Sequence, residues 1–233
     1  MSTNRNVVFV NSYVYHIYNR GVEKRTIYSS KRDYDRHIST LDYYRHLDIP
    51  FKYSKFITSN AKQKSIIIND LEISPKSIDV LAYCLMPNHF HLLIRQNTDN
   101  GISNFIRKTS NSYAKYFNTK NDRVGPLFQN TFKSVWIEND EQLLHVSRYI
   151  HLNPVVSSLK TTEELLSYPW SSLIHYVSSN NNSLVSTDEI LSFFKSPKSY
   201  NKFVFDQADF TNKLRSLESL TLEKLPSWNK LKI

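Results

Sequence analysis

Two pairs of side chains in this sequence have types and spacings that suit metal binding and nucleophilic attack. His89 and His91 flank one phenylalanine within the apolar run AYCLMPNHFHLLI. Tyr149 and Asn153 stand four residues apart in the later segment HVSRYIHLNPV. Histidine is a poor residue for filling a core, and its neutral imidazole is a common metal ligand. The two pairs together predict a reactive site, provided that the fold brings them onto one face.

Local geometry decides whether each pair can act together. In a β-strand, side chains alternate between the two faces, so His89 and His91 point the same way and can share one ion. In a helix, residues four apart lie about 40° from each other around the axis, which places the Tyr149 phenol beside the Asn153 amide. A bare His-x-His pair binds no metal in most proteins, so the prediction depends on the third ligand that Asn153 offers.

The residue types limit the kind of metal site. Cys84 is the single cysteine of the chain, which excludes an internal disulfide and a cysteine-built zinc site. Two imidazoles and one amide fit an open Mg²⁺ or Mn²⁺ site that keeps places for water and phosphate oxygens, although histidine is an unusual ligand for Mg²⁺. Pro154 disfavours helical geometry for the residue before it, so Asn153 is expected at or just past the last helical turn.

The composition indicates a polyanionic partner. The 233 residues include 30 Lys and Arg against 21 Asp and Glu, which gives a net charge of +9. This excess favours nucleic acid through counterion release, and 15 tyrosines and 13 phenylalanines interleaved with the cations suit unpaired bases. Only three glycines occur and no glycine-rich phosphate loop is present, so no nucleotide cofactor is expected. No apolar run is long enough to span a membrane, and the start MSTNRNVVFV lacks the architecture of a signal peptide.

Hydrophobic periodicity predicts seven elements in the order strand, helix, strand, strand, helix, strand, helix. The predicted strands are residues 13–20, 77–86, 89–96 and 132–137, and the predicted helices are residues 29–47, 101–118 and 139–153. Pro87 and Asn88 supply the turn between the two middle strands. This is the order of the split βαβ arrangement, so we predict an α+β, ferredoxin-like fold with an antiparallel sheet and helices gathered on one face.

The same patterns divide the chain into two parts. Residues 1–156 form the predicted domain, and a polar, lysine-rich stretch at about residues 48–76 is predicted to be an irregular insertion in it. Residues 157–233 form a predicted C-terminal helical extension. Its Ser- and Asn-rich loop, VSSNNNSLVS, precedes two helix-like segments, TDEILSFFK and ADFTNKLRSLESL.

Taken together, the motifs resemble a known family. PNHFH, residues 87–91, resembles the His-hydrophobic-His metal motif of the single-tyrosine HUH transposases. RYIHLNPV, residues 148–155, resembles the nucleophile helix of their REP-associated tyrosine transposase branch. YHIYNRGVEKRTIY and GPLFQNTFKS are similar to the family's first strand and to the segment before its last strand. The resemblance spans about residues 10–175, and the combination of motifs makes it specific.

The resemblance implies a metal-dependent endonuclease and strand transferase that acts on single-stranded, hairpin-bearing DNA. By position, His89 and His91 become ligands of Mg²⁺ or Mn²⁺, Asn153 becomes the third ligand, and Tyr149 becomes the nucleophile. The metal would polarise the scissile phosphate and hold it in line with the phenol. Attack by the tyrosine leaves a 5′-phosphotyrosine and a free 3′-OH, and a second 3′-OH resolves this intermediate without ATP.

Cationic residues beside these motifs are the predicted DNA contacts. They lie on the first strand and the loop after it, on the helix of residues 101–118, on the last strand and on the last helix of the domain: Arg20, Lys24, Arg25, Arg107, Lys108, Lys115, Lys133 and Arg148. Relatives often carry an arginine in the GPLFQNTFKS segment where this chain has Thr131, so a contact there is weakened or moved to Lys133. We expect a protein of the bacterial cytoplasm, associated with the nucleoid when bound to DNA, that acts as a monomer or homodimer.

Three alternatives stay open at this point. Tyr116 is the second choice of nucleophile, whereas Tyr113 lies on the apolar stripe of its helix and is expected in the core. The scaffold could serve a domesticated DNA-binding protein without transposition activity. It could also serve a metal-dependent hydrolase that uses water in place of tyrosine. The other histidines of interest are expected to be structural or solvent-facing rather than ligands: His16, His145, His151 and His175.

Overall fold

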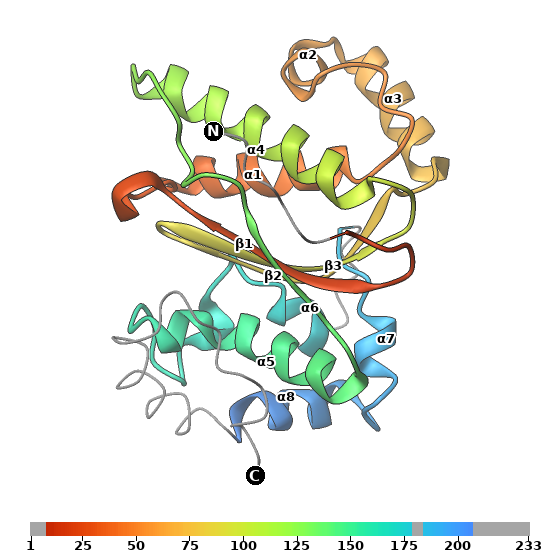
Figure 1. The fold of residues 1–233 in the computed structure, drawn as a ribbon, viewed down its shortest axis with the longest axis vertical. Helices are drawn as coiled ribbons and strands as arrows, with labels where there is room; N and C mark the ends of the chain where they lie inside the picture. Colours follow the sequence, from red (N-terminus) through yellow and green to blue (C-terminus); the bar gives the residue numbers. More distant parts are fainter. Residues whose placement is uncertain (1–7, 179–183, 207–233) are drawn as a thin grey trace.

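A four-stranded antiparallel sheet forms the centre of the computed structural model, which describes residues 8–178 and 184–206 (Figure 1). Its strands are β1 (Val14–Arg20), β2 (Ile78–Met86), β3 (His89–Gln96) and β4 (Lys133–Trp136), and they lie in the order β2-β3-β1-β4. This is the strand order of the split βαβ arrangement. The predicted α+β fold class is therefore confirmed.

The register of the sheet brings polar residues of three strands side by side. His91 of β3 lies opposite Tyr18 of β1, and His89 lies opposite Arg20. On the other side of β1, Lys133 of β4 lies opposite Tyr18. Because directly paired residues of an antiparallel sheet project to the same face, Arg20, Tyr18 and Lys133 share one face with the histidine pair.

Helices α1 (Lys31–Tyr44) and α4 (Gly101–Lys120) cover the opposite face of the sheet (Figure 1). His37 of α1 packs edge-to-face on Phe90, the residue between the two histidines. A capping box at Ser30 starts α1. Helix α4 turns the apolar stripe that its sequence predicts toward the core: Ile102, Phe105, Ile106, Tyr113 and Phe117 are buried.

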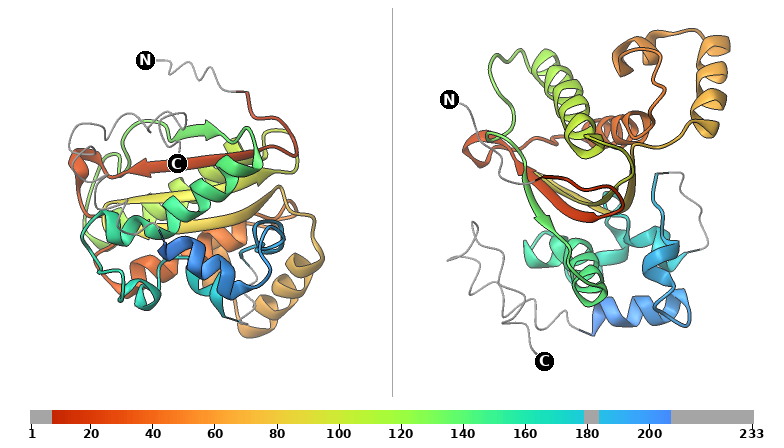
Figure 2. Two further views of the ribbon diagram at one scale, coloured as in Figure 1. Left: turned by 90° about the horizontal axis from the view of Figure 1, so that it is seen from below. Right: turned by 45° about the vertical axis from the view of Figure 1, so that its right-hand side comes forward.

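Helix α5 (Asp140–Val156), capped by Asn139, covers the face that carries the histidine pair (Figures 1 and 2). The expectation that the helices gather on one face thus holds for α1 and α4, and α5 lies on the other side of the sheet. The reason is that both faces of β3 carry apolar side chains. Leu92 and Ile94 are buried on one face and Leu93 on the other, so each face needs a cover.

Pro154 does not end α5, contrary to the sequence prediction. The helix continues to Val156 with the proline inside it. A proline removes one backbone donor, but the next residues still close the turn, since the backbone N–H of Ser157 donates to the carbonyl of Asn153 at 2.9 Å. Asn153 therefore lies within the helix, one turn after Tyr149.

The stretch at residues 48–76 is largely helical, which corrects the prediction of an irregular insertion. It holds two helices, α2 (Tyr53–Thr58) and α3 (Ala61–Ile73), which project beside the layer of α1 and α4 (Figures 1 and 2). The Asn60 side chain caps α3. Only Ile67 and Leu71 of α3 are buried, so the segment lacks the broad apolar stripe by which a packed helix is recognised in a sequence.

The chain after α5 folds back along the outer edge of β2. Its elements are η2 (Leu165–Ser167), α6 (Leu173–Val177), α7 (Asp188–Leu191) and α8 (Pro197–Phe205). The backbone N–H of Leu85 donates to the carbonyl of Trp170, and that of Ser172 donates to the carbonyl of Tyr83, both at 2.9 Å. The predicted helix in TDEILSFFK is the single turn α7, and the segment ADFTNKLRSLESL lies outside the described residues. Among the helices of the described residues, none has the length and apolar character needed to cross a membrane.

Asp33 is a buried anchor between α1 and α4. Its carboxylate accepts hydrogen bonds from the backbone N–H groups of Ser29 and Ser30 at 2.9 and 3.0 Å and from the Tyr116 hydroxyl at 2.9 Å. It also pairs with the Lys120 ammonium at 2.6 Å. Burial alone would raise the pKa of Asp33, but the bonds from Lys120, Ser29 and Tyr116 outweigh it, and the pKa is lowered.

We expect Asp33→Asn to lower the free energy of unfolding at pH 7 by about 2 kcal/mol, because it weakens several charge-assisted hydrogen bonds. A carboxyl whose pKa is lower in the folded than in the unfolded state adds stability above the unfolded pKa, about 3.9, and this contribution is lost as the pH falls through the folded pKa. The difference from wild type should therefore shrink below about pH 4. Urea unfolding at neutral and acidic pH measures it, with the exposed Asp35→Asn as control; equal losses in the two variants at pH 7 would contradict the assignment.

Candidate active site

The two histidines lie where the β2–β3 hairpin turns, under α5. Their ring centroids are 5.0 Å apart and their planes meet at 86°. Nδ1 of His89 lies 2.6 Å from the side-chain oxygen of Asn88, and Nδ1 of His91 lies 2.9 Å from Nε2 of His16. Each ring is thus held through Nδ1, the arrangement in which Nε2 serves as the metal-binding nitrogen.

His16 supports His91 from the neighbouring strand. It is fully buried, and burial lowers the pKa of His16 to about 3, so the ring is neutral. A neutral His16 can accept the Nδ1 proton of His91, which leaves the Nε2 lone pair of His91 available to a cation. His16 therefore belongs to the site as a support and not as a third imidazole ligand.

Asn153 presents its amide oxygen to the histidine pair. The side chain is buried, and its nitrogen donates to the backbone carbonyl of Tyr149 at 3.0 Å. Because the nitrogen is bound to the helix backbone, the oxygen is the atom that remains to face His89, and the Asn153 side chain lies close enough to His89 to influence its pKa. An amide oxygen is a suitable ligand for a hard divalent cation, so the third predicted ligand lies beside the first.

Tyr149 lies against the imidazoles of both β1 and β3. Its ring centroid is 5.6 Å from that of His91 and 6.1 Å from that of His16, edge-on in both cases. The side chain is half-buried. A second phenol, that of Tyr18, stacks on His91 with the centroids 5.7 Å apart. The structure thus brings two tyrosines to the histidine pair, and the sequence prediction had identified one of them.

The state of the histidines fits a metal ion. Burial, assisted by the positive charge of Arg20, lowers the pKa of His89 to about 4, and burial with the nearby His89, His16 and Arg20 lowers the pKa of His91 well below its usual value. Both rings are therefore neutral near pH 7, as ligands must be. The described residues hold no cluster of three or more His, Cys, Asp or Glu side chains that could bind a metal, so a third ligand must be of another type. The amide of Asn153 meets that requirement.

Comparison with known proteins identifies the family. Residues 39–153 match the model of the family described as "Transposase IS200 like", and this segment contains both histidines, Tyr149 and Asn153. Through this segment, the chain belongs to the IS200-like transposase family. Its members are DNA-processing transposases, so DNA is a partner of the protein.

A solved structure supports the fold of this transposase. A REP-associated tyrosine transposase bound to a REP hairpin matches with a TM-score of 0.50 and 15% sequence identity, over 80% of this chain and 92% of that one. At this identity, the likeness concerns the fold. A search of curated proteins gave no match.

Four of the eight predicted DNA contacts of the transposase belong to the strands and the loop next to the histidine pair: Arg20, Lys24, Arg25 and Lys133. The register sets Arg20 beside His89 and Lys133 beside Tyr18 on the same face. Lys24 ends the turn η1 (Val22–Lys24), and the Asn88 amide donates to its carbonyl at 3.2 Å. This bond ties the loop of Lys24 and Arg25 to the turn that precedes the histidines.

The other four predicted contacts lie elsewhere. Arg107, Lys108 and Lys115 belong to α4, across the sheet from the histidine pair. Arg148 is buried, with its guanidinium 4.2 Å above the ring of Phe203 and Nη2 at 2.5 Å from Nδ1 of His145. A side chain that binds phosphate must reach solvent, so these contacts contradict the prediction that Arg148 binds DNA.

The competing tyrosines of α4 are far from the reactive face. Tyr113 is fully buried in the core, as its place on the apolar stripe predicts. The Tyr116 hydroxyl donates to Asp33 at 2.9 Å. Both residues lie on the side of the sheet opposite to α5, so the position of Tyr116 does not support its role as the alternative nucleophile.

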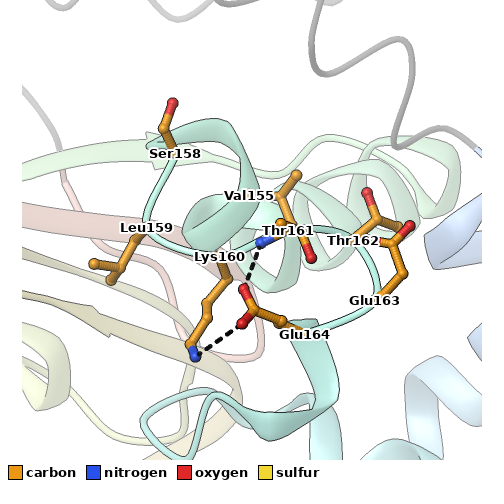
Figure 3. A pocket seen from close by; sticks show the side chains of 8 residues that line it. All are labelled: Val155, Ser158, Leu159, Lys160, Thr161, Thr162, Glu163 and Glu164. Atoms are coloured by element: carbon orange, nitrogen blue, oxygen red, sulfur yellow. Dashed lines mark hydrogen bonds and ion pairs between the residues drawn. The ribbon is translucent and has the colours of Figure 1, made fainter.

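A shallow pocket of about 340 Å³ lies in the loop that follows α5 (Figure 3). It is lined by Val155, Ser158, Leu159, Lys160, Thr161, Thr162, Glu163 and Glu164. Glu164 accepts a hydrogen bond from the backbone N–H of Thr161 at 3.1 Å and approaches the Lys160 ammonium at 4.0 Å. None of the lining residues belongs to the histidine site, so the pocket is a feature of the loop.

The sequence prediction missed His16 and Tyr18 as members of the site. Alternation along YVYHIYNR sets His16, Tyr18 and Arg20 on one face of their strand, and this signal is present in the sequence. The sequence alone does not reveal that β1 pairs with β3 in the register that turns this face toward the histidine pair.

Proposed function

We propose that this transposase is a metal-dependent endonuclease and strand transferase for single-stranded, hairpin-bearing DNA, with Tyr149 as its nucleophile. One observation carries the proposal. The ring of Tyr149 lies 5.6 Å from that of His91, while Asn153, one turn later on the same helix, lies close enough to His89 to influence its pKa. A phenol, an amide oxygen and two neutral imidazoles from distant parts of the sequence thus meet on one face of the sheet.

His89, His91 and Asn153 are the residues that would hold Mg²⁺ or Mn²⁺. A divalent cation bound there would polarise the scissile phosphate and offset the charge that develops on it. The neutral state of both imidazoles, and the anchoring of each through Nδ1, support this assignment.

Tyr149 supplies the oxygen that attacks phosphorus. A bond forms between the tyrosine oxygen and phosphorus, and the bond from phosphorus to the 3′ oxygen of the preceding nucleotide breaks. The phenol loses its proton, and the departing 3′ oxygen takes up a proton to become a free 3′-OH. The product is a 5′-phosphotyrosine. Since one phosphodiester replaces another, a second 3′-OH can reverse the linkage and join two strands without a nucleotide cofactor.

Arg20, Lys133 and Tyr18 offer a surface for the DNA strand beside the reactive residues. The two cations flank the phenol on the face of the histidine pair, so they can bind phosphates while Tyr18 contacts a base. The REP hairpin bound to the solved relative supports a hairpin as the substrate class. Arg107, Lys108 and Lys115 would bind only DNA that also reaches the layer of α4.

Tyr149→Phe should abolish the covalent adduct that forms when the protein is incubated with a labelled hairpin oligonucleotide and Mn²⁺. The substitution removes the attacking oxygen and keeps the ring. Denaturing gel electrophoresis measures the adduct, because only a covalent linkage survives it. Tyr116→Phe removes a phenol on the other side of the sheet and should leave the adduct unchanged.

The same assay separates the alternatives. Cleavage by wild type without an adduct would indicate a hydrolase that uses water. Binding without cleavage would indicate a DNA-binding protein on the same scaffold. An adduct that survives Tyr149→Phe and disappears in Tyr18→Phe would assign the nucleophile to the second phenol of the site.

His16→Phe should weaken Mn²⁺ binding by about 10- to 100-fold, because His91 loses the partner that orients its ring. Isothermal titration calorimetry without DNA measures the affinity, and circular dichroism shows whether the variant is folded. His175→Phe alters a histidine outside the site and should bind Mn²⁺ like wild type. An unchanged affinity in folded His16→Phe would contradict the supporting role.

A further inference from the structure

We propose that the described part of the C-terminal extension, residues 157–178 and 184–206, holds α5 in register over the sheet, that His151 and Tyr200 are positioning residues for Tyr149, and that Tyr149 serves the histidine pair of its own chain. The inference rests on the proposed function, because it concerns the approach of Tyr149 to the reacting phosphate. It assigns a purpose to the segment that follows the transposase motifs.

Helix α5 has one side for chemistry and one side for attachment. Tyr149 and Asn153 lie about 40° apart around the helix axis, whereas His151 lies about 200° from Tyr149. The first two face the histidine pair. His151 instead faces α6 and α8, where it contacts the rings of Tyr176 and Tyr200. A rotation of α5 that moved Tyr149 would therefore break the contacts of His151.

A buried polar network fixes this attachment. Nδ1 of His151 lies 2.7 Å from the Tyr200 hydroxyl, and Nε2 lies 2.8 Å from the Ser172 hydroxyl. The Tyr200 hydroxyl also reaches that of Ser147, one turn earlier on α5, at 3.3 Å. All four side chains are fully buried. Displacing α5 would leave these groups without partners in the core, which is costly.

The network continues into the sheet that carries the histidine pair. The backbone N–H of Tyr83 on β2 donates to the Ser172 hydroxyl at 2.8 Å, and the backbone N–H of Ser172 donates to the Tyr83 carbonyl at 2.9 Å. Strand β2 pairs directly with β3. A continuous series of hydrogen bonds therefore runs from β2 through Ser172 to His151 on α5. It couples the orientation of the helix that carries Tyr149 to the sheet that carries His89 and His91.

Helix α8 adds a second attachment on the same side of α5. The Arg148 guanidinium lies over the ring of Phe203 at 4.2 Å, and its Nη1 donates to the Phe203 carbonyl at 3.4 Å. His145, a turn earlier, also approaches the Phe203 ring, with the centroids 6.2 Å apart. The contact with Phe203 of α8 thus explains why Arg148 is buried. Helix α5 is attached to the C-terminal extension both at His145 and Arg148 and at His151.

These contacts favour action within one chain. An α5 that served a second subunit would have to leave the sheet and carry Tyr149 to another histidine pair. That movement would break the His151 network and the Arg148 contact together. The ring of Tyr149 already lies 5.6 Å from that of His91 in the same chain, so no exchange is required.

Tyr200→Phe tests the positioning role. It removes one hydroxyl from the network and keeps the ring in the core. We expect the rate of adduct formation at saturating hairpin DNA and Mn²⁺ to fall about tenfold or more, because even a small misplacement of a reacting group lowers the rate of reaction strongly. The affinities for DNA and Mn²⁺ should stay unchanged, since Tyr200 touches neither. A loss of stability alone would not lower the rate of adduct formation while leaving the affinities for DNA and Mn²⁺ unchanged.

Tyr176→Phe is the matched control. Tyr176 is also a fully buried tyrosine of the extension, but its hydroxyl donates to the Leu81 carbonyl on β2 and makes no hydrogen bond to α5. We expect Tyr176→Phe to lower the melting temperature about as much as Tyr200→Phe does, and to form the adduct at the wild-type rate. Equal rates in wild type and Tyr200→Phe, or equal losses in both variants, would overturn the positioning role. A wild type that forms no adduct would overturn the proposed function and this inference with it.

Mixing two inactive variants tests the use of Tyr149 within one chain. Tyr149→Phe keeps the histidine pair, and His91→Ala keeps the tyrosine. We expect no adduct from the mixture, even after incubation at high protein concentration, while wild type under the same conditions forms it. An adduct from the mixture, carried by the His91→Ala chain, would show that the tyrosine serves another subunit and would overturn the inference.

Discussion

The pairing of β1 with β3 is the constraint on which the site depends. It sets Tyr18 opposite His91 and Arg20 opposite His89, and it brings His16 to within 2.9 Å of the His91 ring. A shift by one residue would turn these side chains to the other face, against α1 and α4. The support of His91 by His16 and the position of Arg20 beside His89 both follow from this register.

Helix α5 then covers the sheet face that carries His89 and His91. This face has polar side chains at its centre and apolar side chains around them. Buried polar groups are tolerated in a core only when they have partners, and here each imidazole is bound through Nδ1 to Asn88 or His16. The Asn153 amide is bound to the helix backbone in the same way. Two imidazoles and one amide, with no carboxylate or thiolate, form a donor set that suits an exchangeable cation and a phosphate better than a closed structural site. The proposed transposition chemistry needs that openness, because DNA must reach the tyrosine.

Much of this could be predicted from the sequence, because alternation and helical spacing are local. They indicated which residues of HFHLLIRQ share a face and that Tyr149 and Asn153 emerge together, and the order of elements indicated the fold. Features that depend on tertiary contacts were not predictable in this way. The support from His16 requires the strand register, the burial of Arg148 requires α8, and the position of α5 on the second face requires knowledge of what covers Leu93. The insertion was misjudged because α3 buries only Ile67 and Leu71.

The central claim is that the phenol of Tyr149 and the histidine pair share one metal site. Paramagnetic broadening by Mn²⁺ in NMR spectra of protein labelled at the tyrosine rings tests it most directly, because the effect falls steeply with distance from the ion. We expect substoichiometric Mn²⁺ to broaden the ring signals of Tyr149 and Tyr18 first, to spare Tyr113 and Tyr116 across the sheet, and to have no such selective effect in His91→Ala. Sharp Tyr149 signals in the presence of bound Mn²⁺, or equal broadening of all four tyrosines, would contradict the account.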